Sequence, residues 1–250
     1  MAKRKGLFSL LAAFAILWVP LGQQEFLLEH WMKLGVFMAP FLLFIAFAFR
    51  SESQSGVDAQ ILSLLLLITY IAHQFEEHWI DLYGNSYAFK PFLNAMLLER
   101  LGGDDGSAEV LSDAGVFVIN TSLVWLAGAL AIWRAPEHVF PALCMAAVVL
   151  VNAFSHIAAA LFSGAYNPGL LTAVVLFLPA SLGAYAWLVR SAVANTAEVG
   201  ASVTWGLLGH VVMVAGMIAS GWFGALPEPA YFSILILWSI LPVFMFRRAA

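Results

Sequence analysis

A histidine and two glutamates with helical spacing lie inside a long apolar stretch of the chain: His73, Glu76 and Glu77. At about 100° per residue, the glutamates at positions i+3 and i+4 flank the helix face that carries the histidine. A carboxylate at membrane depth is energetically costly, so the pair needs a cation, a proton or a water cavity beside it. The spacing therefore predicts that Glu76 and Glu77 form a catalytic or ion-binding pair next to an imidazole.

A second polar pair lies in another apolar run, where Asn152 and His156 share one helix face at positions i and i+4. Two imidazoles and a carboxylate bind Zn²⁺, with Fe²⁺ and Mn²⁺ as alternatives. No lysine or arginine lies at matching depth in a predicted span to neutralise the glutamates. We predict a single divalent metal, Zn²⁺ first, held by His73, Glu77 and His156. A hydrogen-bond network between helices is the alternative that remains open.

Further polar residues are predicted to support these ligands, because a metal-bound histidine usually donates its other N–H to an acceptor. They are Asn120, Asn152, Tyr70 and Tyr166. In contrast, His78 is rotated by about 140° from His73 on a helix, so it is predicted to point elsewhere and the zincin pattern is absent. Asn167 and Pro168 are explained by the start of a helix, as a cap and a first-turn proline.

The composition indicates a membrane protein that is entirely helical. Of the 250 residues, 62% are hydrophobic and 10% are charged, whereas soluble domains have about 25% charged residues. The net charge of −4 comes without a basic stripe, which argues against nucleic acid as a partner. A single cysteine, Cys144, excludes an intrachain disulfide. We predict an all-α, polytopic membrane helix bundle whose first partner is the lipid bilayer.

About eight transmembrane helices are predicted, because each apolar run approaches the length of about 20 residues that crosses a bilayer. The runs are Gly6 to Gly22, Leu34 to Phe49, Ala59 to Leu82, Ala114 to Trp133, His138 to Phe162, Gly169 to Val189, Ser202 to Phe223 and Ala230 to Phe246. A shorter apolar stretch, Phe92 to Leu101, predicts an interfacial surface helix, with a lid as the alternative. The whole chain, 1–250, is predicted to be one transmembrane domain.

The distribution of basic residues predicts the orientation, because cytoplasmic connectors carry the excess of lysine and arginine. With both termini cytoplasmic, the basic residues that fall inside are Lys3, Arg4, Lys5, Arg50, Arg134, Arg190, Arg247 and Arg248. Only Lys33, Lys90 and Arg100 fall outside. This orientation predicts that the histidine and glutamate cluster lies towards the outer leaflet, with the plasma membrane as the default location.

Three motifs in this order resemble a family of membrane proteins named for the pattern His-x-x-Glu-Glu. The pattern runs from His73 to Glu77, an Asn-x-x-x-His motif joins Asn152 to His156, and Tyr-Asn-Pro-Gly spans Tyr166 to Gly169. The resemblance covers residues 59–189, the predicted core of the domain. It implies no reaction, because the family has no established activity.

Two classes of function fit the predicted cluster. The first is a membrane metal-dependent enzyme, a hydrolase or isomerase, that acts on a lipid, isoprenoid or other apolar small molecule from the outer leaflet. The second is a proton- or cation-coupled transporter that uses the buried glutamate pair. The polar residues gather towards one face of the membrane and no inverted repeat is evident, which favours the enzyme. A structural subunit whose polar cluster only fixes helix order is the third hypothesis.

Overall fold

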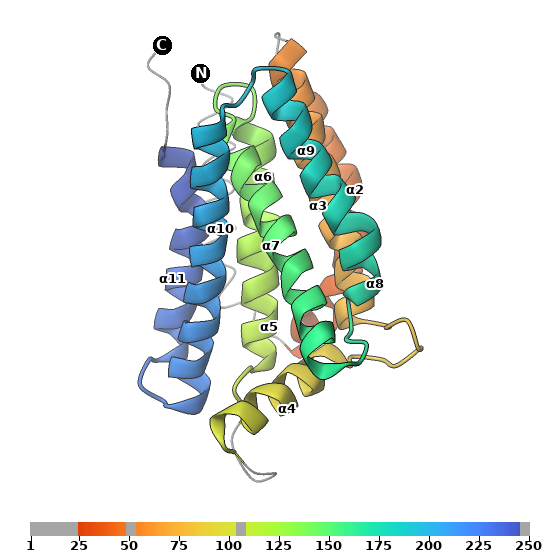
Figure 1. Cartoon of the computed structure of the whole chain (residues 1–250), viewed down its shortest axis with the longest axis vertical. Helices are drawn as coiled ribbons and strands as arrows, with labels where there is room; N and C mark the ends of the chain where they lie inside the picture. Colours follow the sequence, from red (N-terminus) through yellow and green to blue (C-terminus); the bar gives the residue numbers. More distant parts are fainter. Residues whose placement is uncertain (1–24, 49–53, 104–108, 246–250) are drawn as a thin grey trace.

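The structure is a computed structural model that describes residues 25–48, 54–103 and 109–245. Within these ranges the chain is helical apart from turns, loops and one isolated bridge between Ile80 and Ser86. The long helices run side by side along one axis and form a bundle (Figure 1). The predicted all-α helix bundle is therefore confirmed.

Five helical segments are long and apolar enough to cross a membrane: Asp58–His78, Asp113–Arg134, Phe140–Ser163, Leu170–Arg190 and Thr196–Trp222. They correspond to the helix α3 (Gln54–His78), α5 with α6 (Asp113–Asn120 and Ala127–Arg134), α7 (Phe140–Ser163), α8 with α9 (Leu170–Thr172 and Leu178–Arg190) and α10 (Thr196–Met217). Two of them continue through a π-helical turn, at Thr121–Leu126 and at Ala173–Phe177, and α10 ends in a third, at Ile218–Trp222. Five of the eight predicted spans are thus confirmed as helices compatible with a multi-span membrane protein.

The other three predicted spans have different outcomes. Gly6 to Gly22 lies outside the described residues. The helix α2 (Glu25–Ala48) includes most of the second span but begins nine residues earlier than predicted, with Glu25 in its first turn. An acidic first turn interacts favourably with the N-terminal end of the helix dipole, so the helix extends through the predicted connector. At the other end, α11 (Glu228–Ile240) and the 3₁₀ turn Leu241–Phe244 form a shorter apolar helix.

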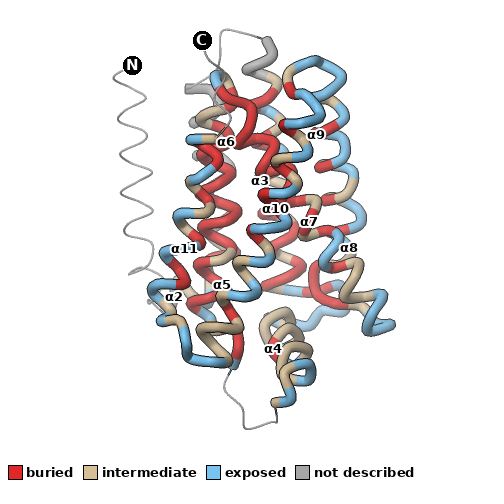
Figure 2. Tube along the Cα trace, turned by 60° about the vertical axis from the view of Figure 1, so that its left-hand side comes forward, coloured by how far each residue is buried: buried red, intermediate tan, exposed pale blue. Residues whose placement is uncertain are grey.

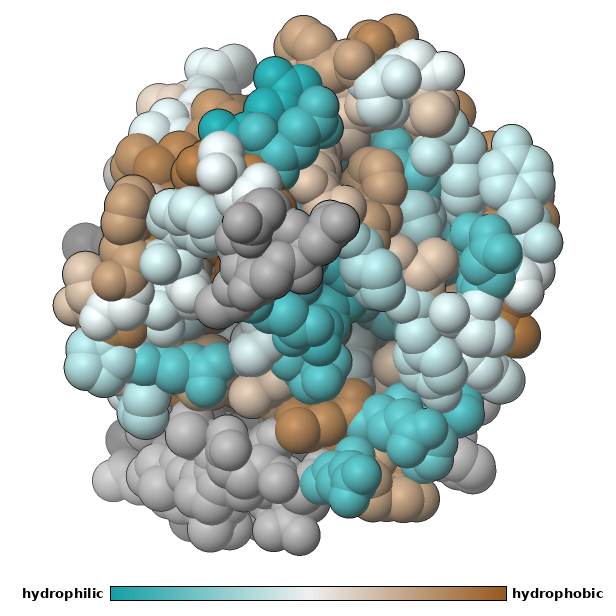
Figure 3. Space-filling view, turned by 90° about the horizontal axis from the view of Figure 1, so that it is seen from below, coloured by the Kyte–Doolittle hydropathy of each residue, from teal (hydrophilic) through white to brown (hydrophobic). Residues whose placement is uncertain are grey.

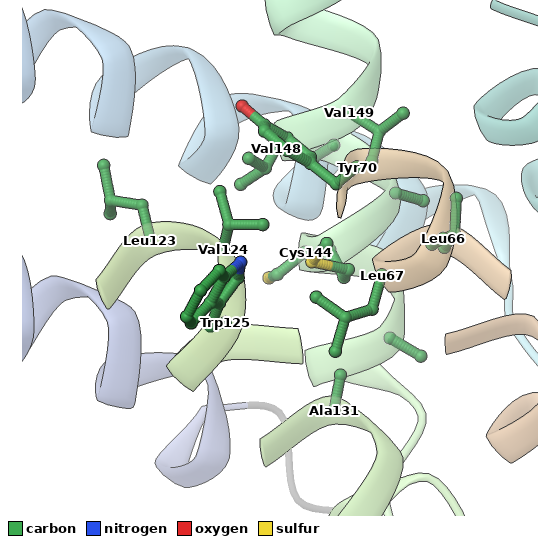
Figure 4. Close-up of a cluster of buried hydrophobic side chains, with 14 of the residues drawn as sticks. Leu66, Leu67, Tyr70, Leu123, Val124, Trp125, Ala131, Cys144, Val148 and Val149 are labelled. Carbon is green, nitrogen blue, oxygen red and sulfur yellow. The ribbon is translucent and has the colours of Figure 1, made fainter. Parts of the chain in front are cut away.

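The span that contains α5 and α6 is the central helix of the bundle. Of its apolar window 94% is buried inside the protein, against 28% for the span that contains α10. Figure 2 shows the same contrast between the buried inner helices and the exposed outer faces. Side chains from α3, this central span and α7 meet in an apolar layer that includes Leu67, Trp125 and Cys144 (Figure 4). This packing fixes α3 and α7, which carry the histidines, relative to each other.

The helix α4 (Phe89–Leu101) lies across one end of the bundle (Figure 1). It confirms that the predicted stretch is helical, and it begins three residues earlier than expected. The side chain of Asn94 attaches α4 to the segment before α5, because it donates to the Leu111 carbonyl and accepts from the N–H groups of Val110 and Leu111. Seen from this end, polar and apolar side chains are interspersed (Figure 3). The orientation of this end in a membrane stays a prediction.

Candidate metal centre

His73, Glu77 and His156 come together at the end of the bundle where α4 lies. One nitrogen or oxygen atom from each lies within 4.8 Å of the others, and all three residues are buried. The Nε2 atom of His73 lies 3.5 Å from Oε2 of Glu77, and the Nε2 atom of His156 lies 3.3 Å from Oε1. The helical spacing places His73 and Glu77 on one face of α3, and α7 supplies His156 opposite them.

Asn167 fixes which ring nitrogen of His156 carries the proton. The Nδ1 atom of His156 lies 2.7 Å from Oδ1 of Asn167, whose Nδ2 donates to the main-chain oxygen of His156 at 2.9 Å. Because the amide oxygen only accepts, the neutral ring carries its proton on Nδ1 and presents the lone pair of Nε2 to Glu77. The prediction that Asn167 caps a helix is therefore wrong, since its side chain binds His156 and caps no helix.

Thr172, which the sequence did not single out, does the same for His73. The hydroxyl of Thr172 lies 2.8 Å from Nδ1 of His73 and donates its one proton to Glu76 at 2.5 Å. Its oxygen is therefore left to accept from Nδ1–H of His73, so Nε2 of this ring also carries a lone pair. That Nε2 atom is buried and has no hydrogen-bond partner among the described residues. Two nitrogen lone pairs and a carboxylate thus face one another.

Glu76 is held by the start of the helix that begins with α8. Its carboxylate accepts hydrogen bonds from the N–H groups of Leu171 and Thr172, at 3.0 and 2.7 Å, and from the hydroxyls of Tyr166 and Thr172, at 2.9 and 2.5 Å. The exposed N–H groups and the dipole of a helix N-terminus favour a negative charge. These four donors stabilise the carboxylate of Glu76 without a metal ion, so the two glutamates of the predicted pair have different surroundings.

His78 also reaches the cluster, which corrects the prediction that it points elsewhere. Its Nε2 atom lies 2.8 Å from Oε2 of Glu77 and 3.0 Å from Nδ2 of Asn120. Asn120 in turn accepts from Gln74, which accepts from the indole N–H of Trp125. The rotation along α3 does not separate the two rings from the same carboxylate, because Oε2 of Glu77 contacts the Nε2 atoms of both His73 and His78. A buried polar chain from α5 and its π-helical turn therefore ends at this carboxylate.

Gly169 allows the loop after α7 to approach both histidine rings. Its φ is +94°, and a Cβ atom at this position would lie 2.7 Å from Cε1 of His73 and 2.8 Å from Cε1 of His156. Both distances are shorter than side chains tolerate, and the positive φ itself favours glycine. The last residue of the Tyr-Asn-Pro-Gly motif is therefore required by space as well as by backbone conformation.

A comparison with family models matches residues 64–184 to a family described as a protein of unknown function with HXXEE motif. This segment contains all three motifs and all the side chains of the cluster. The family resemblance is confirmed. Comparisons with curated proteins and with solved structures gave no match for the chain. The segment 64–184 is called the HXXEE segment below.

The remaining side chains predicted to support the ligands lie around the cluster of the HXXEE segment. Nδ2 of Asn152 donates to the hydroxyl of Tyr70 at 2.5 Å, and the Tyr70 ring packs edge-on against His73, with 5.7 Å between ring centroids. Tyr166 contacts Glu76 and not a ligand histidine. The structure thus brings all four predicted supporting residues near the cluster, whereas Asn167 and Thr172 make the direct contacts to the histidines. The sequence signal for Asn167 was its place in the Tyr-Asn-Pro-Gly motif, whereas Thr172 lies three residues after that motif and had none.

Proposed function

We propose that the HXXEE segment binds one divalent metal between His73, Glu77 and His156 and that the protein is a membrane-embedded, metal-dependent hydrolase. The observation that carries the proposal is the orientation of the two rings. In the neutral form of each ring, an oxygen acceptor holds Nδ1–H, and the Nε2 lone pair then faces the carboxylate of Glu77. Lone pairs directed at one point without a donor between them repel, and a cation turns that repulsion into attraction.

Two histidines and one carboxylate form a donor set that suits Zn²⁺. Catalytic zinc sites have three protein ligands and an open position, where the metal lowers the pKa of bound water to about 7 and polarises a carbonyl. In this proposal Glu77 and His78 accept the proton from the bound water, and their side chains contact each other with 2.8 Å between Oε2 and Nε2. Glu76 already accepts from four donors, so in this proposal it orients His73 through Thr172.

The surroundings of the cluster suit an apolar substrate. A cavity of about 280 Å³ reaches Glu77 and His156, and apolar side chains supply most of its lining. An apolar layer lies between the cluster and the opposite end of the bundle. Its buried side chains include Leu66, Leu67 and Val148 (Figure 4). This layer favours chemistry at one side of the protein over the transport alternative, which needs a polar route through the bundle.

Hydrolysis assays on the full chain in lipid nanodiscs test the proposal. The protein is treated with a chelator, reloaded with Zn²⁺, and offered a panel of uncharged lipid esters and amides. We expect hydrolysis that disappears with the chelator, returns with Zn²⁺ and is absent in Glu77→Gln. The control is His30→Ala, because His30 lies outside the cluster and contacts Lys33. Hydrolysis that survives metal removal, or that Glu77→Gln retains in full, contradicts the proposal.

A further inference from the structure

One cavity of the bundle begins at the metal ligands and continues away from them. Glu77, His156 and Asn152 form its polar end. The rest of its wall comes from α3, α4, α5, α7, α10, the segment before α5 and the loop after α7, and is mainly apolar. Its volume of about 280 Å³ is at the small end of ligand cavities, which measure about 300–1,000 Å³. A space of this size suits one hydrocarbon chain and not a lipid with two.

The helix α4 turns its apolar face to this cavity. Phe89, Phe92, Leu93, Met96 and Leu97 all line it, and their spacing of three, four and seven residues marks one face of a helix. Asn94, which lies off this face, forms the hydrogen bonds that hold α4 to the segment before α5. The wall of the cavity is therefore a fixed apolar surface.

Between α7 and α10 the cavity reaches residues that are exposed. Near the middle of the bundle these helices pack closely, since a Cβ atom on Gly206 would lie 2.8 Å from Cβ of Ala147. Towards α4 they diverge (Figure 1). There Ser155 of α7 and Val214 of α10 line the cavity and are also exposed on the outside of the bundle. In a membrane these exposed faces contact lipid, so this side of the cavity faces the bilayer.

The charge of the lining limits the ligand. The lining residues include no lysine or arginine, and their only carboxylate is that of Glu77. A phosphate group in this cavity would lack the cationic partners that phosphate sites use. Methionines on α4 and α10, Met96, Met213 and Met217, add adaptable apolar surface. An uncharged chain fits this lining, and a phosphate-bearing one does not.

We propose that this cavity binds one uncharged single-chain lipid, which enters from the bilayer between α7 and α10 and places its polar end at Glu77 and His156. The proposal rests on the function proposed above for the identity of the reacting end. It names the substrate class as an ester or amide of one fatty acyl chain without phosphate. Binding of the chain is a property of the cavity and is measured separately from metal binding.

Photolabelling of the full chain in nanodiscs tests this proposal. The probe is a monoacylglycerol with a diazirine in its acyl chain, and the competitors are the unlabelled monoacylglycerol and the corresponding monoacylglycerol phosphate. We expect labelled peptides from α4 and from the part of α10 that contains Met213 and Met217. The neutral competitor should reduce this labelling about tenfold more effectively than the phosphate.

A matched pair of tryptophan variants tests the entrance. Val214→Trp fills the opening and should reduce labelling by about tenfold. Val211→Trp is the control, because Val211 lies one turn away on the same helix, is 62% exposed and does not line the cavity. Metal content is measured in the same samples. Labelling of the cavity without bound metal would overturn only the function proposed above.

Three results would overturn the cavity proposal itself. They are labelling confined to the outer, lipid-facing surfaces of the helices, equal competition by the phosphate-bearing lipid, and an equal effect of the two tryptophans. The peptide map of the unsubstituted protein decides the first of these, so the test does not depend on the folding of either variant.

Discussion

The Nδ1 atom of His156 lies 2.7 Å from Oδ1 of Asn167, and Nδ2 of the same amide donates to the main-chain oxygen of His156. The two bonds fasten the loop after α7 to the helix that it follows. They also set the protonation of the ring, so that the opposite nitrogen is free to bind a cation. Neighbouring side chains and backbone, and not the histidine alone, define the ligand.

Asn167→Ala should weaken metal binding by about 10- to 100-fold, the usual effect of losing a partner of a ligand histidine. The reason is that His156 loses its acceptor and its fixed tautomer. Competition with a chromogenic chelator measures the affinity. Asn167→Asp keeps an oxygen opposite Nδ1 and should retain most of the affinity, so equal losses in the two variants would contradict the assigned role.

Glu76→Gln and Glu77→Gln should differ in kind. The carboxylate of Glu76 accepts hydrogen bonds from two N–H groups and two hydroxyls. A glutamine at this position removes the negative charge and places its NH₂ group, which is a donor, against one or more of these donors. We expect a loss of about 1–3 kcal/mol in the free energy of unfolding, with metal still bound. Glu77→Gln should instead lose the metal. Thermal unfolding and metal analysis of both variants separate the roles, and a reversed pattern would contradict the assignment.

Gly169→Ala should disrupt the centre, because its Cβ atom would lie 2.7 Å from His73 and 2.8 Å from His156. We expect metal affinity to fall by about 10- to 100-fold as the rings shift. Gly164→Ala is a matched control. Gly164 also has a positive φ, +65°, but a Cβ atom there meets nothing within 4 Å. If the two alanines have the same effect, backbone strain and not crowding at the rings explains it.

Asp81, in the turn after α3, gives a pH dependence. Burial alone raises the pKa of its carboxyl, but hydrogen bonds from the Asn85 side chain and from the N–H groups of Asn85, Tyr83 and Gly84 outweigh burial and lower it. A folded-state pKa below the unfolded value of about 3.9 adds stability above that value. This stability disappears as the pH falls through the folded-state pKa.

Asp81→Asn should therefore lower the thermal unfolding midpoint at pH 7. The difference from the unsubstituted protein should shrink progressively as the pH falls below about 4. Unfolding curves in detergent across this range measure it. A difference that stays constant down to the acid end of the range would show that the charge of Asp81 does not contribute.

The sequence was sufficient for those parts of the site that depend on local helical spacing. His73 and Glu77 share a face of α3 because they are four residues apart, and the apolar runs predicted most helices because their length and composition suit a bilayer. The start of α2 was missed because its first turns carry charged residues. Predicted boundaries shifted wherever a cap decided them, as at the capping box of Asn195 and Glu198 that begins α10.

Other parts of the site depend on contacts between distant segments. Glu76 is satisfied by backbone N–H groups 95 and 96 residues later in the chain, and no pattern of side-chain types indicates such donors. Thr172 was missed for the same reason, because a threonine near a helix start has many ordinary explanations. His78 was misjudged because helical angles locate a side chain but not the reach of the carboxylate beside it.

Metal analysis of the purified full chain tests the central claim most directly. The protein is purified in detergent, dialysed against buffer with Zn²⁺, washed, and its metal measured by mass spectrometry. We predict about one equivalent per chain, retained by His30→Ala and lost by His73→Ala and by His156→Ala. Folded protein that holds no metal, or His73→Ala and His156→Ala variants that hold as much as the unsubstituted chain, would contradict the account.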